Sequence, residues 1–319
     1  MRLRSVRAGI AAAITALTFA SSPLALADEP PTTTAEPTTT TSTDVRSSDA
    51  LSSVGPGHFA GDLLGRKVFN VPGCVPSPEH PTPVLFVHGT AGNTAMWLPA
   101  ARALKKRGYC VYGWDYGKLP AREQALFPGF YGLADINDNA KELAANVERV
   151  KQMTGAKQVD LVGHSQGGTL TKKYIAQLGG ADSVRRVVAA GGSFHGTTMG
   201  GMTEVAESKG GQQTRSRVRA GDQQRWNSEH IRELNTFPDT DPRVVYTSIY
   251  SPSDGVVTPY SSSMLESVGG ADVANVNVEA TCGGYVNHIF MPMNRKITAM
   301  VVWGLEREVG DHAPKGCRF

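Results

Sequence analysis

The stretch "VDLVGHSQGG", residues 159–168, decides how the rest of the chain is interpreted. Gly163, Ser165 and Gly167 match the pattern G-x-S-x-G, in which a serine occupies a sharp turn between a strand and a helix. In a chain with 35 glycines, a match to this five-residue pattern alone is weak evidence for such a turn. Interpreting Ser165 as a nucleophile therefore requires a strand before it, a helix after it and partner residues further along the chain.

Both flanks of Ser165 have the required pattern. The segment "KQVDLVG" (157–163) is a short apolar run that is typical of a buried strand. The segment "GGTLTKKYIAQLGG" (167–180) predicts a helix that ends at its two final glycines. We therefore expect Ser165 at the carboxyl end of a strand, directly before a helix.

Strands and helices alternate along the rest of the chain. We expect further strands at 83–89, 109–116, 184–192, 243–250 and 272–278, and helices at 94–108, 135–153 and 294–308. This alternation predicts an α/β fold, a mostly parallel central sheet with helices on both faces. Ligand sites of such sheets lie at the carboxyl ends of the strands, which is where we expect Ser165.

The first residues read as an export signal rather than as part of the fold. Three arginines precede the apolar run 8–20, and Ala25-Leu26-Ala27 offers a cleavage site, so we interpret 1–27 as a signal peptide. An uncleaved anchor is the alternative, but the run is short for a bilayer, and we expect no transmembrane anchor. Residues 28–57 are rich in Thr, Pro and Ser and predict a disordered linker, either an envelope tether or a plain spacer. Residues 58–319 are then expected to form a single domain.

The charge balance argues against two classes of partner. The net charge of +3 equals the three arginines within 1–27, so the remaining chain is neutral. A neutral chain has no basic surplus for nucleic acid and no polybasic tract for anionic membranes. We expect an extracellular protein, with cell-envelope association as an additional possibility.

Four cysteines, Cys74, Cys110, Cys282 and Cys317, suggest disulfides in an exported chain. Three pairings are possible. We favour Cys74–Cys110 and Cys282–Cys317, because each closes a local loop, with free thiols as the alternative. The chain has no C-x-x-C pair and no histidine at ligand spacing from these cysteines, so no metal site is expected.

A serine nucleophile needs a base and an acid, and the expected chain order is Ser, then Asp or Glu, then His. Asp254 follows the strand expected at 243–250, whereas Asp239 and Asp241 precede it and Asp272 begins another strand. His288 and His312 are the two histidines beyond Asp254. We favour His288, which follows the strand expected at 272–278, over His312, which lies past the last helix.

An oxyanion needs hydrogen-bond donors as well. The backbone N–H of Gln166 is the expected first donor, and the N–H of Thr90, in the loop "FVHGTAGN" (86–93), is the expected second one. His88 lies two residues before Thr90, where we expect it to brace the backbone without taking part in chemistry. His164 is adjacent to the serine, and we expect its side chain to point away.

Taken together, "LFVHGTAGN", "GHSQGG", "YSPSDGVVTPY" and "NHIFMP" resemble secreted bacterial lipases and esterases of the α/β-hydrolase superfamily, especially the actinobacterial class 2 lipases. The resemblance covers roughly residues 58–317. It implies an α/β-hydrolase fold, a triad of Ser165, Asp254 and His288, oxyanion donors at Thr90 and Gln166, and ester hydrolysis without a cofactor. It also suits the cysteine pairing favoured above. A calcium site cannot be carried over residue by residue.

The expected substrate contacts are less specific. Met96, Trp97, Phe194 and Ile289 flank the expected site loops and are candidates for an acyl pocket, with ordinary packing as the alternative. The long segment 193–242 is expected beside the site and includes a further possible helix. Within it, Met199, Met202 and Trp226 are further candidates for an acyl groove, with packing on the domain as the preferred interpretation.

We predict a secreted carboxylic ester hydrolase, most simply a triacylglycerol lipase or carboxylesterase, whose partner is a lipid or other ester. A transient contact with a lipid interface or the cell envelope fits the same interpretation. Alternatives are a cell-envelope acyltransferase using the same site and a catalytically silent envelope-binding protein on the same fold. A peptidase is a weaker alternative, because nothing in the sequence suggests peptide recognition.

Overall fold

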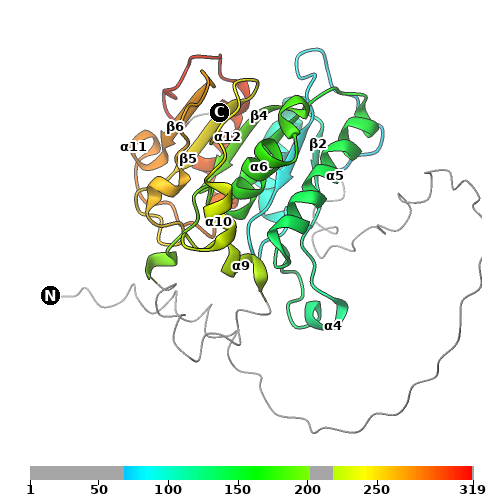
Figure 1. The fold of residues 1–319 in the computed structure, drawn as a ribbon. Helices are drawn as coiled ribbons and strands as arrows, with labels where there is room; N and C mark the ends of the chain where they lie inside the picture. Colours follow the sequence, from blue (N-terminus) through cyan, green and yellow to red (C-terminus); the bar gives the residue numbers. More distant parts are fainter. Residues whose placement is uncertain (1–67, 202–217, 318–319) are drawn as a thin grey trace, which may run out of the picture. The chain divides into compact units, whose positions relative to one another are not determined.

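The computed structural model describes residues 68–201 and 218–317 (Figure 1). The expected signal peptide (1–27), the expected linker (28–57) and Met202 lie outside these residues. Six parallel strands form one sheet in the order β2-β1-β3-β4-β5-β6. The strands are β1 Val84–Val87, β2 Val111–Gly113, β3 Val159–His164, β4 Val184–Ala190, β5 Val245–Tyr250 and β6 Val273–Asn277. Each predicted strand is present, although β2 is much shorter than the expected 109–116.

The order of the strands reverses between β1 and β3. The chain runs from β1 outward to β2, then crosses back to place β3 on the other side of β1. The loops that follow β1 and β3 therefore leave the sheet in opposite directions at its carboxyl edge. This switch point is where open α/β sheets form ligand sites.

Helices cover both faces of the sheet, as predicted (Figure 1). On one face, α3 (Leu98–Lys106) and α12 (Arg295–Glu306) pack with 3-10 helix η1 (Thr94–Trp97) against alternate strand residues such as Phe86, Val162 and Val188. On the other face, α5 (Ile136–Thr154) and α6 (Gln166–Gln177) pack against their neighbours Leu85 and Leu161. Successive strand residues point to opposite faces, so apolar residues at every position of β1 and central β3 supply both cores.

The ends of α5 follow from its sequence. The Asp135 carboxylate accepts a hydrogen bond from the N–H of Asn137 at 2.8 Å and caps the first turn. Gly155 has a left-handed φ of 70° and ends the helix. This 19-residue helix therefore has a defined start and stop on the face of the sheet that carries α6.

The segment 193–242 contains two short α-helices in its described part, α9 (Arg219–Gln223) and α10 (Glu229–Leu234). The remaining short helices are α4 (Ala121–Gln124), after β2, and α11 (Val278–Cys282), directly after β6. The sequence suggests one further helix in this segment, whereas the structure has two, and both are too short and polar to have a strong local pattern. Ser228 caps α10 by accepting from the N–H of Ile231 at 3.1 Å.

Both expected disulfides are present. Cys74 is bonded to Cys110, and Cys282 to Cys317, with Cα atoms 5.8 and 5.4 Å apart. The first ties the segment before β1 to the start of β2, and the second ties α11 to the chain that follows α12. Among residues 68–201 and 218–317, no helix is long and apolar enough to cross a bilayer.

Candidate active site

Ser165 occupies the turn between β3 and α6, with φ 53° and ψ −119°. A non-glycine residue with positive φ is uncommon, and an observed outlier of this kind is a reason to look for function. Its N–H donates to the carbonyl of Ala190 at 3.2 Å, which fixes the turn against the end of β4. The side chain is largely buried, with 9% of the residue's surface exposed.

The flanking glycines make room for this turn. A Cβ at Gly163 would lie 2.9 Å from the backbone carbon of Gly167, and a Cβ at Gly167 would overlap the carbonyl oxygen of Val87. The start of α6 therefore lies directly against the end of β1. This close approach requires glycine at both positions of the G-x-S-x-G pattern.

Asp254 and His288 form a buried pair. Nδ1 of His288 lies 2.6 Å from Oδ2 of Asp254, and neither residue exposes more than 6% of its surface. Oδ1 of Asp254 accepts the N–H groups of Val256 and Val257 at 2.8 and 2.9 Å. The carboxylate is thus held by its own loop while its second oxygen orients the imidazole.

This pair lies at the same edge of the sheet as Ser165. A Cβ at Gly191, the residue after β4, would lie 3.1 Å from Nδ1 of His288. The imidazole ring of His288 is also 4.8 Å from that of His164, the residue before Ser165. Oγ of Ser165 makes no hydrogen bond to any described residue, and such contacts are often open without substrate.

The residues that competed with Asp254 and His288 have other partners. The three carboxylates are each in an ion pair (Asp239–Lys172, Asp241–Arg243, Asp272–Arg307). His312 is exposed, and its Nε2 lies 3.4 Å from Oδ1 of Asp272. The structure therefore brings together the acid and base favoured from the sequence and places the alternatives elsewhere.

Two backbone N–H groups near Ser165, those of Thr90 and Gln166, have no hydrogen-bond partner among residues 68–201 and 218–317. Thr90 follows β1 and Gln166 begins α6, on the two sides of the switch point. Their side chains are hydrogen-bonded to each other, with Nε2 of Gln166 donating to Oγ1 of Thr90 at 2.7 Å. The free N–H of Gln166 belongs to the helix N-terminus, where partial positive charge accumulates.

The Thr90 hydroxyl accepts a second hydrogen bond that sequence analysis missed. Nε2 of Gln224, directly after α9, donates to Oγ1 of Thr90 at 2.7 Å, and Oε1 of Gln224 accepts from the Ser193 hydroxyl at 3.0 Å. Asn139 on α5 in turn donates to Oε1 of Gln166 at 3.0 Å. With both lone pairs of the Thr90 hydroxyl used, its own proton is the group left to donate.

His88 is buried and structural, as expected. Burial lowers its pKa to about 4, so the ring is neutral at pH 7. The ring stacks on Tyr116, whose hydroxyl donates to the carbonyl of His88 at 2.6 Å. These contacts fix the end of β1, from which the Thr90 loop departs.

The residues expected to contact substrate divide into two groups. Trp97 and Phe194 are at most 1% exposed and belong to the packed interior, so the packing alternative describes both. Met96 is partly exposed, with its sulfur close to Gly92 in the Thr90 loop. Ile289 is 47% exposed beside His288, where it can touch a ligand.

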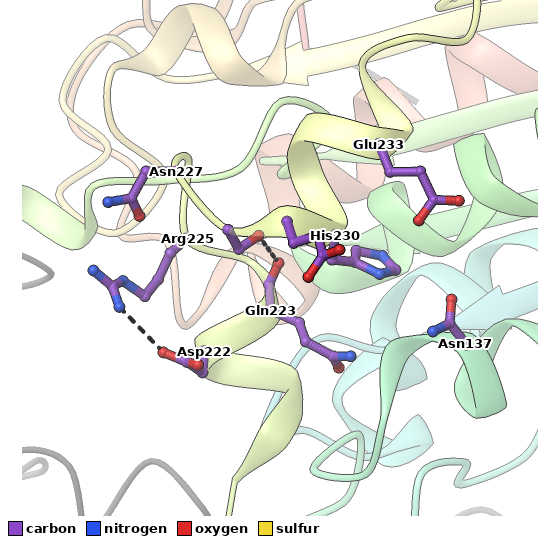
Figure 2. A pocket seen from close by; sticks show the side chains of 9 residues that line it. Asn137, Asp222, Gln223, Arg225, Asn227, His230 and Glu233 are labelled. Carbon is purple, nitrogen blue, oxygen red and sulfur yellow. Dashed lines mark hydrogen bonds and ion pairs between the residues drawn. The ribbon is translucent and has the colours of Figure 1, made fainter.

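A polar pocket is lined by residues of α9, α10 and the start of α5 (Figure 2). Its lining residues are Asn137, Asp222, Gln223, Arg225, Asn227, Ser228, Glu229, His230 and Glu233. None of the three residues Ser165, Asp254 and His288 belongs to it. No group of three or more His, Cys, Asp or Glu side chains within the described ranges is arranged to hold a metal ion.

The family model described as "Lipase (class 2)" matches residues 81–289. The chain belongs to the class 2 lipase family. The matched range contains Thr90, Ser165, Asp254 and His288, and it ends one residue after the last of them.

Two relatives are triacylglycerol lipases, from Pseudarthrobacter phenanthrenivorans and Burkholderia plantarii, each 35% identical to this class 2 lipase over 102 residues. The matches cover 30% of this chain and 28% and 25% of the relatives, so the chain spans about a quarter of their length.

Among solved structures, Aspergillus fumigatus lipase B is similar with a TM-score of 0.56 and 23% identity, covering 72% of this chain and 53% of that one. Bacillus licheniformis lipase BlEst2 in propeptide form is similar with a TM-score of 0.55 and 19% identity, and the match covers 76% of this chain and 54% of that one. These two likenesses support the α/β-hydrolase fold.

Proposed function

We propose that the chain is a secreted carboxylic ester hydrolase that uses Ser165 as nucleophile, His288 as base and Asp254 as orienting acid. One observation carries this proposal. The positive-φ Ser165 and the buried His288–Asp254 pair converge at the carboxyl edge of the sheet from three separate loops. A serine on a constrained turn, beside an imidazole already oriented by a carboxylate, is the arrangement that acyl transfer requires.

The reaction proceeds in two halves. His288 takes the proton of the Ser165 hydroxyl while Oγ attacks the ester carbonyl carbon, and the imidazolium then protonates the departing alcohol. A water molecule, deprotonated by His288, attacks the resulting acyl-enzyme, and the proton returns to Oγ as the acid leaves. Asp254 stabilises the imidazolium in both halves without being protonated.

The negative charge on the carbonyl oxygen is held by the N–H groups of Thr90 and Gln166, with the Thr90 hydroxyl as a third donor. The amide groups of Gln166 and Gln224 orient that hydroxyl, because both donate to its oxygen. Donors that are fixed before the reaction need no reorganisation when the charge develops.

The substrate is proposed to be a lipid ester. Two triacylglycerol lipases are among the relatives, although they share only part of their length with this chain. Around His288, the side chains of Tyr285, Ile289 and Phe290 are 60, 47 and 56% exposed, and such an apolar rim suits an acyl chain or a lipid surface. Secretion is supported by the pattern of residues 1–27 and by two disulfides, which persist in oxidising compartments.

The test is hydrolysis of p-nitrophenyl esters from C2 to C16 by residues 28–319, beside the Ser165→Ala variant. We expect kcat to fall by roughly 10³- to 10⁶-fold in this variant, because the attacking oxygen is gone. Ser261→Ala, which alters an exposed serine outside the proposed triad and oxyanion donors, is the matched control and should keep parental activity. Parental activity in Ser165→Ala would refute the proposal, and an optimum at C2–C4 would refute its lipid part.

A further inference from the structure

His164 is a buried histidine to which the proposed reaction assigns no role. It precedes Ser165 directly, at the end of β3, and exposes only 4% of its surface. Its side chain reaches the loop that carries His288, where Nε2 lies 3.0 Å from the backbone carbonyl oxygen of His288. One residue of the turn therefore carries the proposed nucleophile, and its neighbour contacts the proposed base.

The protonation of His164 follows from its surroundings. Burial lowers the pKa of His164 well below its usual value, and a proton on the neighbouring His288 would lower it further, so the ring of His164 is neutral at pH 7. Its single N–H must be on Nε2, because the atom facing Nε2 is a carbonyl oxygen, which only accepts. Nδ1 has no hydrogen-bond partner among the described residues.

The niche around His164 leaves little freedom. A Cβ at Gly89 would lie 2.9 Å from Nδ1 of His164, and the Trp97 ring meets the imidazole edge-on. The ring of His288 rests against that of His164 at 4.8 Å with a tilt of 40°. The N–H of Met291 donates at 3.1 Å to the same carbonyl of His288 and completes its hydrogen bonding.

We propose that His164 is a positioning residue that sets the distance between Ser165 and His288. The hydrogen bond from Nδ1 to Asp254 fixes the rotation of the His288 imidazole. It does not fix the position of the His288 backbone relative to Ser165. The hydrogen bond from His164 places that backbone relative to the turn, so nucleophile and base shift together. Because His164 is neutral, no adjacent charge opposes formation of the His288 imidazolium. The inference rests on the proposed function.

The test compares His164→Gln with His164→Met in ester hydrolysis. The two side chains have similar length and volume, and the Gln amide nitrogen can reach the position of Nε2, whereas Met has no donor. We expect His164→Met to lower kcat roughly 10- to 100-fold with KM within about twofold, since small displacements of reacting groups cost rate rather than binding. His164→Gln should restore most of kcat, and thermal unfolding checks that both variants are folded.

Equal kcat in parent and His164→Met would overturn the inference, and so would equal losses in both variants. A second measurement needs no variant. Nitrogen NMR of ¹⁵N-histidine protein at pH 7 should show His164 neutral with its proton on Nε2, and a charged ring or an Nδ1–H form would overturn the inference. Failure of the proposed function is distinguishable, because it would appear as an inactive parent or an active Ser165→Ala variant.

Discussion

At the scale of single residues, Asp254 shows how one carboxylate can both hold its own loop and orient a neighbouring histidine. One oxygen accepts two backbone N–H groups of its own loop and the other pairs with His288. Both oxygens must therefore act as acceptors. An amide in this place cannot satisfy both sides, because its NH₂ group faces either the backbone donors or the imidazole N–H.

Asp254→Asn is accordingly expected to lower kcat by about 10⁴-fold, because the imidazole is held in the wrong tautomer. The free energy of unfolding should fall by about 1–3 kcal/mol, the cost of a buried mismatched polar group. Ester assays and urea unfolding measure both effects. Glu308→Gln, at an exposed carboxylate after α12, is the matched control and should change neither quantity. A fully active Asp254→Asn variant would contradict the assigned role.

Thr90 tests the third oxyanion donor. Thr90→Val keeps the shape and the backbone N–H but removes the hydroxyl, and it leaves the amide N–H groups of Gln166 and Gln224 without their acceptor. We expect kcat to fall by roughly 10²-fold, as for the loss of one oxyanion donor. Thr90→Ser keeps the hydroxyl and should retain most of kcat. If Val and Ser behaved alike, the hydroxyl would have no part in catalysis.

At the scale of elements, the sequence predicts the parts whose signal is local. The strands β1, β3 and β4 are apolar runs next to glycines, and α5 has an apolar face and a capping aspartate, so they were predicted to within one or two residues. The pairing of Asp254 with His288 could also be anticipated, because each of the two residues follows a recognisable strand. The short β2 and the polar α9 and α10 have weak local patterns and depend on packing instead.

Contacts between distant segments could not be predicted in the same way. Gln224 meets Thr90 across 134 positions, and His164 meets His288 across 124. No periodicity or motif relates such pairs, since they become neighbours only when the sheet order is known. For the same reason, Trp97 and Phe194 could be taken for substrate contacts, because they are close in sequence to the site loops. In the folded chain, both side chains are buried in the core.

The junction of β1 and α6 gives a prediction about an element. Gly167→Ala would drive a Cβ into the carbonyl of Val87, a backbone atom that cannot move independently of β1. We expect a loss of about 1–3 kcal/mol in the free energy of unfolding, as for other overpacked sites, together with reduced activity. Gly221→Ala, in α9, is the control. Its nearest neighbour would be Val218 at an ordinary 3.7 Å, so stability should rise by about 0.4–1 kcal/mol.

At the scale of the whole molecule, buried neutral histidines link stability to pH. Burial lowers the pKa of His88 and of His230 to about 4, and that of His164 still more clearly. These side chains take up a proton near pH 6.5 when the chain is unfolded but not when it is folded. The unfolded state therefore binds more protons between pH 6.5 and 4, and folding stability falls as the pH drops through this window. Burial raises the pKa values of Glu142 and Asp160, which opposes this trend in part.

A single-residue difference isolates the effect. His230, on α10, is the best position because it lies outside the proposed catalytic machinery, and Nε2 has no partner to lose. In His230→Gln, one titrating group is removed. Above pH 7, the difference in free energy of unfolding between parent and variant should be constant, since His230 is neutral in both the folded and the unfolded parent protein. Between pH 6.5 and 4, the parent should lose stability relative to the variant by about 1.4 kcal/mol per pH unit.

Urea unfolding of both proteins from pH 8 to pH 4.5 measures this difference directly. Because the variant shares every other titrating group, the opposing contributions of Glu142 and Asp160 cancel in the comparison. A difference that stays constant across the range would mean that His230 accepts a proton in the folded state as readily as in the unfolded one. The desolvation that lowers its pKa would then be offset, for instance by the nearby carboxylates of Glu233 and Asp135, whose charges favour the protonated ring.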